Sequence, residues 1–326
     1  MQLKQEFKIT IEHVGYTIVD FLSQHLMDYD KNTLKKMIHK QFVSVNSRDV
    51  LPNRKLHLGD KVKVYIPKKE LHNYPQTTPD LDIIFEDDDF LIINKKIAIS
   101  KYGDIGPLKK AVKKYLKSNP DTDCNPKFVQ NIEREVTGAV LIAKNTAIEK
   151  YLIKLFERNL VTKEYLALVS GTPEEQGTID LKIAKGPKYM EVRKDGTLTF
   201  TKYNLIEKLG DFSLIKASTL SALKDQVRLH LAHHGYPLAV DPVYGFRKVL
   251  NLSEIKKKYK PKKGVPEKPL ISRVSLHLHK IHFLLPNAQP IKIEAPMAKD
   301  LQIAIKKLRK YSENIGVQHG NKQSGK

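Results

Sequence analysis

The sequence predicts an α+β protein in which a mixed β-sheet and a few helices form a large body behind a small N-terminal section. Short runs of alternating apolar and polar residues, punctuated by glycine, recur along the chain and are typical of strands. Segments with apolar residues at helical spacing lie between them, and no internal repeat is visible. Residues 72–79 contain two prolines and predict a linker between the two sections.

The length of the chain and the shifts in its composition predict its organisation. Its 326 residues are enough for two or more domains with sizeable cores. We expect a small α/β domain over residues 1–70, a linker over 71–79, the main body over 80–312 and a disordered polar tail over 313–326. Within the body, helical periodicity is found at residues 107–116, 147–156, 226–234 and 299–311.

The small N-terminal section is expected to contain two helices followed by two strands. The first helix covers about residues 17–26, and the second follows Asp30 and Asn32, which are plausible N-cap residues. Alternation predicts short strands at residues 42–46 and 61–66.

Composition indicates a polyanionic partner. The net charge is +21, from 57 basic and 36 acidic residues, and nucleic acid is the simplest polyanion for such a chain. No apolar run approaches the ~20 residues needed to cross a bilayer, and the N-terminus has no secretory signal pattern. The single cysteine, Cys124, makes neither an internal disulfide nor a cysteine-based zinc site.

The N-terminal section carries the pattern of a basic helix, a strand, a Gly-Asp turn and a second strand. It resembles the small RNA-binding domain first described in ribosomal protein S-four, through residues 31–38, Val43, Val45-Asn46 and Leu58-Gly59-Asp60, although the family's glycine before the strand is Gln41 here. The alternative is an ordinary helix with a solvated lysine face. The resemblance implies RNA contacts from the lysines of this helix, which are Lys31, Lys35, Lys36 and Lys40.

The segment from Gln130 to Gly138, which an apolar run follows, is the most informative stretch of the chain. It resembles the catalytic motif of the RluA-type pseudouridine synthases, H-R-L-D-x-x-T-S-G. When the two are aligned on Gly138, the family's catalytic aspartate corresponds to Glu133, and its histidine and arginine correspond to Gln130 and Asn131. The carboxylate is thus retained on a longer side chain, while its two neighbours are replaced.

Two later motifs extend this resemblance. Residues 158–171 resemble R-x-V-x-K-x-Y-x-A-x-V-x-G and place Tyr165 where the family has a tyrosine against the uracil. Residues 220–231 resemble L-x-T-G-R-T-H-Q-I-R-V-H-L and retain Arg228, whereas the motif's first arginine and first histidine correspond to Leu223 and Asp225. In the family the retained arginine pairs with the catalytic aspartate. We therefore expect Arg228 to pair with Glu133 and to keep this carboxylate ionised.

The resemblance implies a catalytic set and an RNA-contacting set around it. Glu133, Tyr165 and Arg228 form the first, and Gln130, Asn131 and Arg134 contribute to the second. The reaction breaks the bond between uracil nitrogen and ribose and rejoins the base through carbon, and it implies no cofactor and no metal. The extra methylene of a glutamate moves the carboxylate by roughly a bond length, and a misplacement of ~1 Å can cost ~100-fold in rate.

Two functions stay open from the sequence. The first is a pseudouridine synthase that acts on structured ribosomal or transfer RNA, with Glu133 in the role of the aspartate. The second is a catalytically inactive RNA-binding protein that aids ribosome assembly or RNA folding, and the replacements clustered around Glu133 favour it. Both imply structured RNA as partner, a cytoplasmic location, no membrane and no obligate protein partner. The lysine-rich insert at residues 252–268 is either an RNA contact or a solvated loop.

Overall fold

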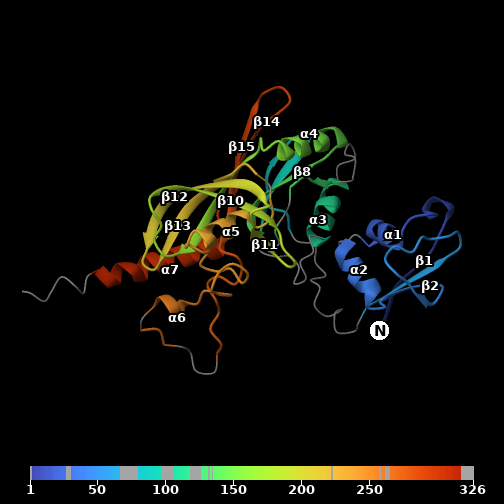
Figure 1. The fold of residues 1–326 in the computed structure, drawn as a ribbon, viewed down its shortest axis with the longest axis horizontal. Coiled ribbons are helices and arrows are strands. Elements are labelled where there is room, and N and C mark those ends of the chain that lie inside the picture. The colour runs from blue at the N-terminus through green and yellow to red at the C-terminus, as the bar shows by residue number, and fades with distance from the viewer. Residues whose placement is uncertain are drawn as a thin grey trace, which may run out of the picture. The chain divides into compact units, whose positions relative to one another are not determined.

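The computed structural model describes residues 2–26, 31–66, 80–96, 106–117, 126–130, 133, 135–221, 223–256, 258–260 and 265–316. The chain divides into two compact units, one formed by residues 1–80 and 98–124, and the other by residues 81–97 and 125–326. Figure 1 shows a small sheet with helices at the N-terminal end of the chain and a large sheet flanked by helices in the remainder. No helix of the described residues is long and apolar enough to cross a membrane.

The N-terminal part of the first unit, up to residue 66, is a four-stranded antiparallel sheet with two α-helices. Its strand order is β1-β4-β2-β3, where β1 is Gln2–Lys8, β2 Val43–Val45, β3 Arg48–Asp49 and β4 Lys61–Ile66. A 3₁₀ turn (Ile11–His13) precedes helices α1 (Ile18–His25) and α2 (Lys31–His39). The helices and strands predicted for this section are confirmed, and β1 is an additional strand that the sequence did not predict.

Local hydrogen bonds set the ends of these elements. The Thr17 side chain accepts a hydrogen bond from the backbone N–H of Asp20 and so caps α1. α2 begins at Lys31, so Asn32 lies inside the helix and its prediction as an N-cap is wrong, while Asp30 lies outside the described residues. Asn46 donates to the carboxylate of Asp60 over 2.7 Å, which joins the end of β2 to the turn before β4.

The second unit is built on one large mixed sheet. Its strand order is β11-β10-β12-β13-β9-β14-β8-β6-β5, with β15 beside β14 and β7 beside β8. β14 and β8 run parallel, and the other pairings are antiparallel. The predicted α+β class with a mixed sheet is therefore confirmed. The strands are β5 Ile83–Glu86, β6 Phe90–Lys95, β7 Lys127–Phe128, β8 Thr137–Ala143, β9 Thr162–Ser170, β10 Gln176–Lys185, β11 Met190–Val192, β12 Thr197–Leu209, β13 Phe212–Thr219, β14 Leu276–Leu284 and β15 Pro290–Glu294.

Four of the next five helices begin within one residue of the predicted periodicity, and the short helix in the insert, Leu252–Ile255, was not predicted. The five helices are α3 (Gly106–Lys117), α4 (Thr146–Glu157), α5 (Gln226–His233), α6 (Leu252–Ile255) and α7 (Lys299–Gly316). α3 lies in the segment that groups with the first unit, although its residues fall within the range expected for the body, and the expected domain boundaries stay a prediction. α7 continues to Gly316, so the tail expected to be disordered from residue 313 is helical over residues 313–316.

The centre of the large sheet is held by a close approach between two strands. Gly138 in β8 pairs with Leu278 in β14 and has a φ of +113°, in the region that favours glycine. A Cβ atom built on Gly138 would overlap the carbonyl oxygen of Leu278 and lie 2.7 Å from its backbone nitrogen. Only glycine allows β8 and β14 to pair at this point, directly after the segment that carries Glu133.

Candidate active site

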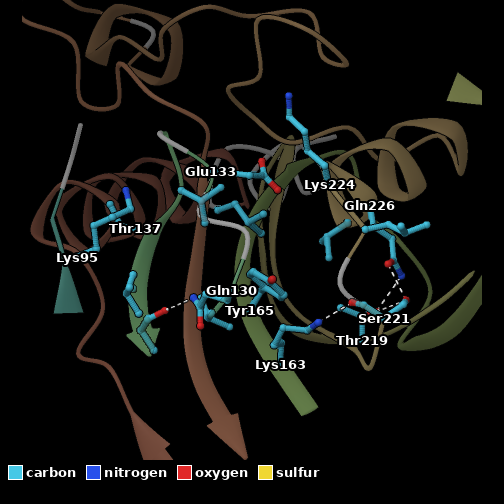
Figure 2. Close-up of a pocket in the computed structure, with 18 of the residues that line it drawn as sticks. Lys95, Gln130, Glu133, Thr137, Lys163, Tyr165, Thr219, Ser221, Lys224 and Gln226 are labelled. Carbon is cyan, nitrogen blue, oxygen red and sulfur yellow. Dashed lines mark hydrogen bonds between the residues drawn. The ribbon is translucent and has the colours of Figure 1, made fainter. Parts of the chain in front are cut away.

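A pocket opens between the segment before β8, the strand β9, the end of β13 and the start of α5 (Figure 2). Its empty volume is about 690 Å³, part of which is open to solvent. Glu133, Tyr165, Lys163 and Gln130 all line it, so elements far apart in the sequence meet here. The pocket therefore contains two of the three residues predicted to be catalytic.

Glu133 is held by groups at the start of α5. One oxygen of its carboxylate accepts a hydrogen bond from Nη1 of Arg228 over 3.1 Å, and the other accepts one from the backbone N–H of Asp225 over 3.3 Å. The side chain of Glu133 is 21% exposed. The predicted pairing of Arg228 with Glu133 is present, and it fixes the carboxylate at the pocket wall.

Arg228 lies behind this carboxylate and is not among the residues that line the pocket. Its Nε and Nη2 donate to the two oxygens of Asp241 over 2.7 and 2.8 Å, a bidentate pair of the kind that gives both strength and fixed geometry. Nη1 also donates to Asp225 over 2.8 Å. One guanidinium group is therefore shared by three carboxylates, those of Asp241, Asp225 and Glu133.

The shared guanidinium changes the charge state of Glu133. Burial raises the pKa of Glu133, Arg228 opposes this rise, and the neighbouring Asp225 carboxylate adds to it, so that the pKa is about 7. We expected Arg228 to keep Glu133 ionised, and this expectation is wrong near neutral pH. The largest cause is burial, and the charge of Asp225, which also binds Arg228, adds to it.

Tyr165 projects from β9 into the same pocket. Burial, and then the charge of Glu133, raise the pKa of its hydroxyl well above the usual value, so the hydroxyl keeps its proton. Figure 2 shows its ring between Gln130 and Lys163 in the pocket. An aromatic ring in this position offers a flat face to a planar ligand, as stacking requires.

Lys163, two residues earlier on β9, lies in the pocket with a buried amine. Its Nζ donates to the backbone carbonyls of Leu220 and Ser221, which follow β13 (Figure 2). Burial lowers the pKa of Lys163 to about 8. This lysine shapes the pocket wall by fixing the turn that separates β13 from α5.

Gln130 lines the pocket but is bonded to protein backbone. Its amide nitrogen donates to the carbonyl of Ala139 over 3.0 Å, and its amide oxygen accepts from the N–H of Leu141 over 3.3 Å. β7 pairs with the end of β8, and the side chain of Gln130 adds two hydrogen bonds to the backbone of β8 next to this pairing. Of the other residues predicted to contact RNA at this motif, Asn131 and Arg134 lie outside the described residues.

The predicted lysines of the N-terminal section lie on or beside α2. Lys31, Lys35, Lys36 and Lys40 are all exposed. Lys31 donates to Asp20 over 2.6 Å, so part of its charge is neutralised locally. The exposed positive charge of this helix therefore rests mainly on the other three lysines.

Sequence reasoning missed two members of the site. Asp241 follows the segment Gly235–Val240 and is not among the predicted site residues, while Asp225 stands where the resembled motif has a histidine. The signal for both is the same, since a buried arginine needs anionic partners. Among the described residues, no group of three or more His, Cys, Asp or Glu side chains could hold a metal ion.

Comparisons with known proteins place this pocket in a family context. The family model described as RNA pseudouridylate synthase matches residues 89–233, which include Glu133, Tyr165 and Arg228. The chain is 28% identical to the uncharacterized RNA pseudouridine synthase YlyB of Bacillus subtilis over 92% of this chain and 96% of that protein. It is 29% identical to the ribosomal large subunit pseudouridine synthase C of Vibrio vulnificus over 90% of this chain and 93% of that protein.

Solved structures share the fold over about seven tenths of this chain. The human RNA pseudouridylate synthase domain containing 1 superposes with a TM-score of 0.51 at 20% identity, over 72% of this chain and 97% of that chain. The human RNA pseudouridylate synthase domain containing 4 gives a TM-score of 0.51 at 16% identity, over 70% and 92% of the two chains. At these identities the likeness concerns the fold alone.

Proposed function

This chain belongs to the RluA-type family of pseudouridine synthases, and we propose that it is an active synthase in which Glu133 supplies the reactive carboxylate. One observation supports the proposal most strongly. Arg228 and the backbone N–H of Asp225 each donate a hydrogen bond to the carboxylate of Glu133, in a pocket that Tyr165 also lines. A longer side chain can be catalytically competent when both of its oxygens are fixed.

In this proposal the residues have separate roles. Conversion of uridine to pseudouridine breaks the N1–C1′ bond, forms a C5–C1′ bond, releases the hydrogen of C5 as a proton and leaves a proton on N1. The overall step is an isomerisation without a redox change. The ionised form of Glu133 acts as the nucleophile or base, the ring of Tyr165 lies against the uracil, and Arg228 positions Glu133 from behind.

We further propose structured RNA as the substrate and RNA of the large ribosomal subunit as its first candidate. The relatives from Vibrio vulnificus and Haemophilus ducreyi carry the names of ribosomal large subunit pseudouridine synthases C and D. The net charge of +21 suits a polyanionic substrate. The exposed lysines Lys35, Lys36 and Lys40 of the S-four-like section, and the described part of the insert at 252–268, are candidate phosphate contacts.

A second function is favoured by one observation. Asp225 shares Arg228 with Glu133, and this leaves Glu133 partly protonated near neutral pH. A protonated carboxyl group is neither a nucleophile nor a base. A protein that binds RNA without modifying it, as an assembly or folding factor would, is consistent with that state.

One experiment separates the two functions. The gene is deleted, the pseudouridines of ribosomal and transfer RNA are mapped, and the strain is complemented with the wild type, Glu133→Ala or Glu157→Ala. Glu157 is exposed at the end of α4 and serves as the matched control. The active synthase predicts a lost site that the wild type and Glu157→Ala restore and Glu133→Ala does not. A complete set of pseudouridines in the deleted strain would favour the binding function.

A further inference from the structure

The start of α5 holds an unusual balance of charge. Arg228 is 9% exposed at its side chain, and three carboxylates surround it, of which Asp225 and Asp241 are 4% and 1% exposed. If all three carboxylates were ionised, one buried positive charge would face three negative charges. Like charges in such a site cannot all ionise at ordinary cost, and a proton is retained by one of the carboxyl groups.

The three carboxylates differ in the number of hydrogen bonds that they accept. Asp241 accepts hydrogen bonds from Nε and Nη2 of Arg228 and from the backbone N–H groups of Val243 and Tyr244. These bonds stabilise its negative charge, and its pKa is lowered. Asp225 accepts from Nη1 of Arg228 and from the hydroxyl of Tyr244 over 3.1 Å. Glu133 has only one bond to Arg228 and one longer bond to a backbone N–H. Glu133 is therefore the carboxylate with the weakest hydrogen-bond support of the three.

We propose that Asp225 is a positioning residue that competes with Glu133 for Nη1 of Arg228 and so sets how strongly the arginine holds the Glu133 carboxylate. This inference rests on the proposed function for its catalytic meaning. Asp225 occupies the position where the family motif has a histidine, and neither the family match nor the names of the relatives give this position a role.

Backbone geometry commits Asp225 to this place. Its φ of +56° is in the left-handed region, which aspartate tolerates better than most residues. In this conformation its N–H points to Glu133 while its side chain reaches Arg228 and Tyr244. The backbone N–H of Asp225 thus donates to one oxygen of Glu133. The side chain of Asp225 shares the Arg228 guanidinium that donates to the other oxygen of Glu133.

Other charged groups near the pocket do not replace this effect. Lys95, Lys163 and Lys224 line the pocket from β6, β9 and the start of α5. Lys163 directs its amine to the backbone carbonyls after β13, and in Figure 2 Lys95 and Lys224 lie on either side of Glu133. The groups that set the charge of Glu133 are Arg228 and Asp225, while Tyr165 responds to the charge of Glu133.

Sharing Arg228 with Asp225 affects how strong a base the Glu133 carboxylate is. A carboxylate that protonates near neutral pH is a stronger base than one held fully ionised by an arginine. Removal of the Asp225 charge gives Glu133 a larger share of Arg228, lowers the pKa of Glu133 and makes its carboxylate a weaker base. Activity is then expected to rise at pH 6 and to fall on the alkaline plateau.

The test compares Asp225→Asn with the wild type in two measurements on the full chain. The first is the carboxyl titration of Glu133, followed by NMR with glutamate labelled at the side-chain carboxyl carbon and assigned by the signal lost in Glu133→Gln. We expect the midpoint near pH 7 to move down by at least about one unit, which raises the ionised fraction at pH 6 about fivefold. The second is the pH profile of pseudouridine formation, in which the acid limb moves by the same amount.

Two further variants keep the test decisive. Tyr244→Phe removes the hydroxyl that donates to Asp225, together with its bonds to the backbone of Met190, and keeps the charge of Asp225. It is expected to move the Glu133 midpoint in the same direction by less, so it replaces Asp225→Asn if that protein does not fold. Asp195→Asn is the matched control, because Asp195 also pairs with an arginine, Arg193, but at an exposed turn. It is expected to leave the midpoint unchanged.

The outcomes distinguish this inference from the proposed function. A shifted midpoint in a protein without activity supports the role of Asp225 and refutes the active synthase. An active protein in which neither Asp225→Asn nor Tyr244→Phe moves the Glu133 midpoint refutes the role of Asp225 and leaves the synthase in place.

Discussion

Replacement of Arg228 by methionine should strongly destabilise the second unit, because it leaves Asp241 buried without its cation. Asp241 is 1% exposed and uses both oxygens to bind Arg228. Removing one partner of such a buried pair costs about 3–5 kcal/mol. For a unit of this size, 1 kcal/mol corresponds to about 2–4 °C in melting temperature, so a decrease of roughly 6–20 °C is expected.

The pH dependence of this loss has a defined sign. Arg228 lowers the pKa of Asp241 in the folded chain, so its stabilisation is present above the unfolded pKa of about 3.8 and disappears as pH falls through the folded pKa. The difference in melting temperature between Arg228→Met and the wild type should therefore be largest near pH 8. It should become smaller towards pH 3, where Asp241 becomes protonated.

Differential scanning calorimetry of the full-length protein measures this effect, with Arg193→Met as the matched control. Arg193 pairs with Asp195 at similar distances, but its side chain is 43% exposed, so Arg193→Met is expected to lower the melting temperature far less than Arg228→Met. In an Asp241→Asn background, Arg228→Met should cost less than in the wild type. Equal losses for the two arginines, or an equal cost in both backgrounds, would refute the reasoning.

Three further perturbations follow from the same geometry. Gly138→Ala should lower the unfolding free energy by at least about 3 kcal/mol in chemical denaturation, because its Cβ has no room beside Leu278 and its φ is strained. Lys163→Met should flatten the rise in stability between pH 8 and 10.5, since a lysine with a lowered folded pKa destabilises the fold below that pKa and ceases to do so as it deprotonates. Gln130→Ala should cost about 1–2 kcal/mol and speed amide exchange at Leu141, because two hydrogen bonds to β8 are lost.

Much of the fold follows from local sequence patterns. The periodicity of Ile148, Leu152, Leu155 and Phe156 predicted α4, and these side chains are buried in the core. The order of the motifs placed Glu133, Tyr165 and Arg228 in one site, and the structure brings them together. Such patterns are local or have fixed spacing, so they can be recognised without knowledge of the pairing of distant strands.

Other features depend on contacts between distant segments. β1 was missed because its sequence, Gln2–Lys8, alternates weakly and gains its partner only from β4, about sixty residues later. The bonds of Gln130 to Ala139 and Leu141 were not predicted because they require the register of β8, and its contact with RNA stays a prediction. The pairing of Asp241 with Arg228 was missed because the two residues are 13 positions apart and meet only when the segment after α5 folds back.

The central claim, that Glu133 is the reactive carboxylate, is tested most directly by pseudouridine formation in a purified system. Ribosomal RNA from the gene-deleted strain is incubated with excess wild-type protein or Glu133→Gln, and pseudouridine is quantified by mass spectrometry while RNA binding is measured in parallel. We predict that the wild type forms pseudouridine at one or a few sites, and that Glu133→Gln binds the RNA with similar affinity but forms at least about 100-fold less. Equal formation by both proteins, or none by the wild type despite tight binding, would contradict the claim.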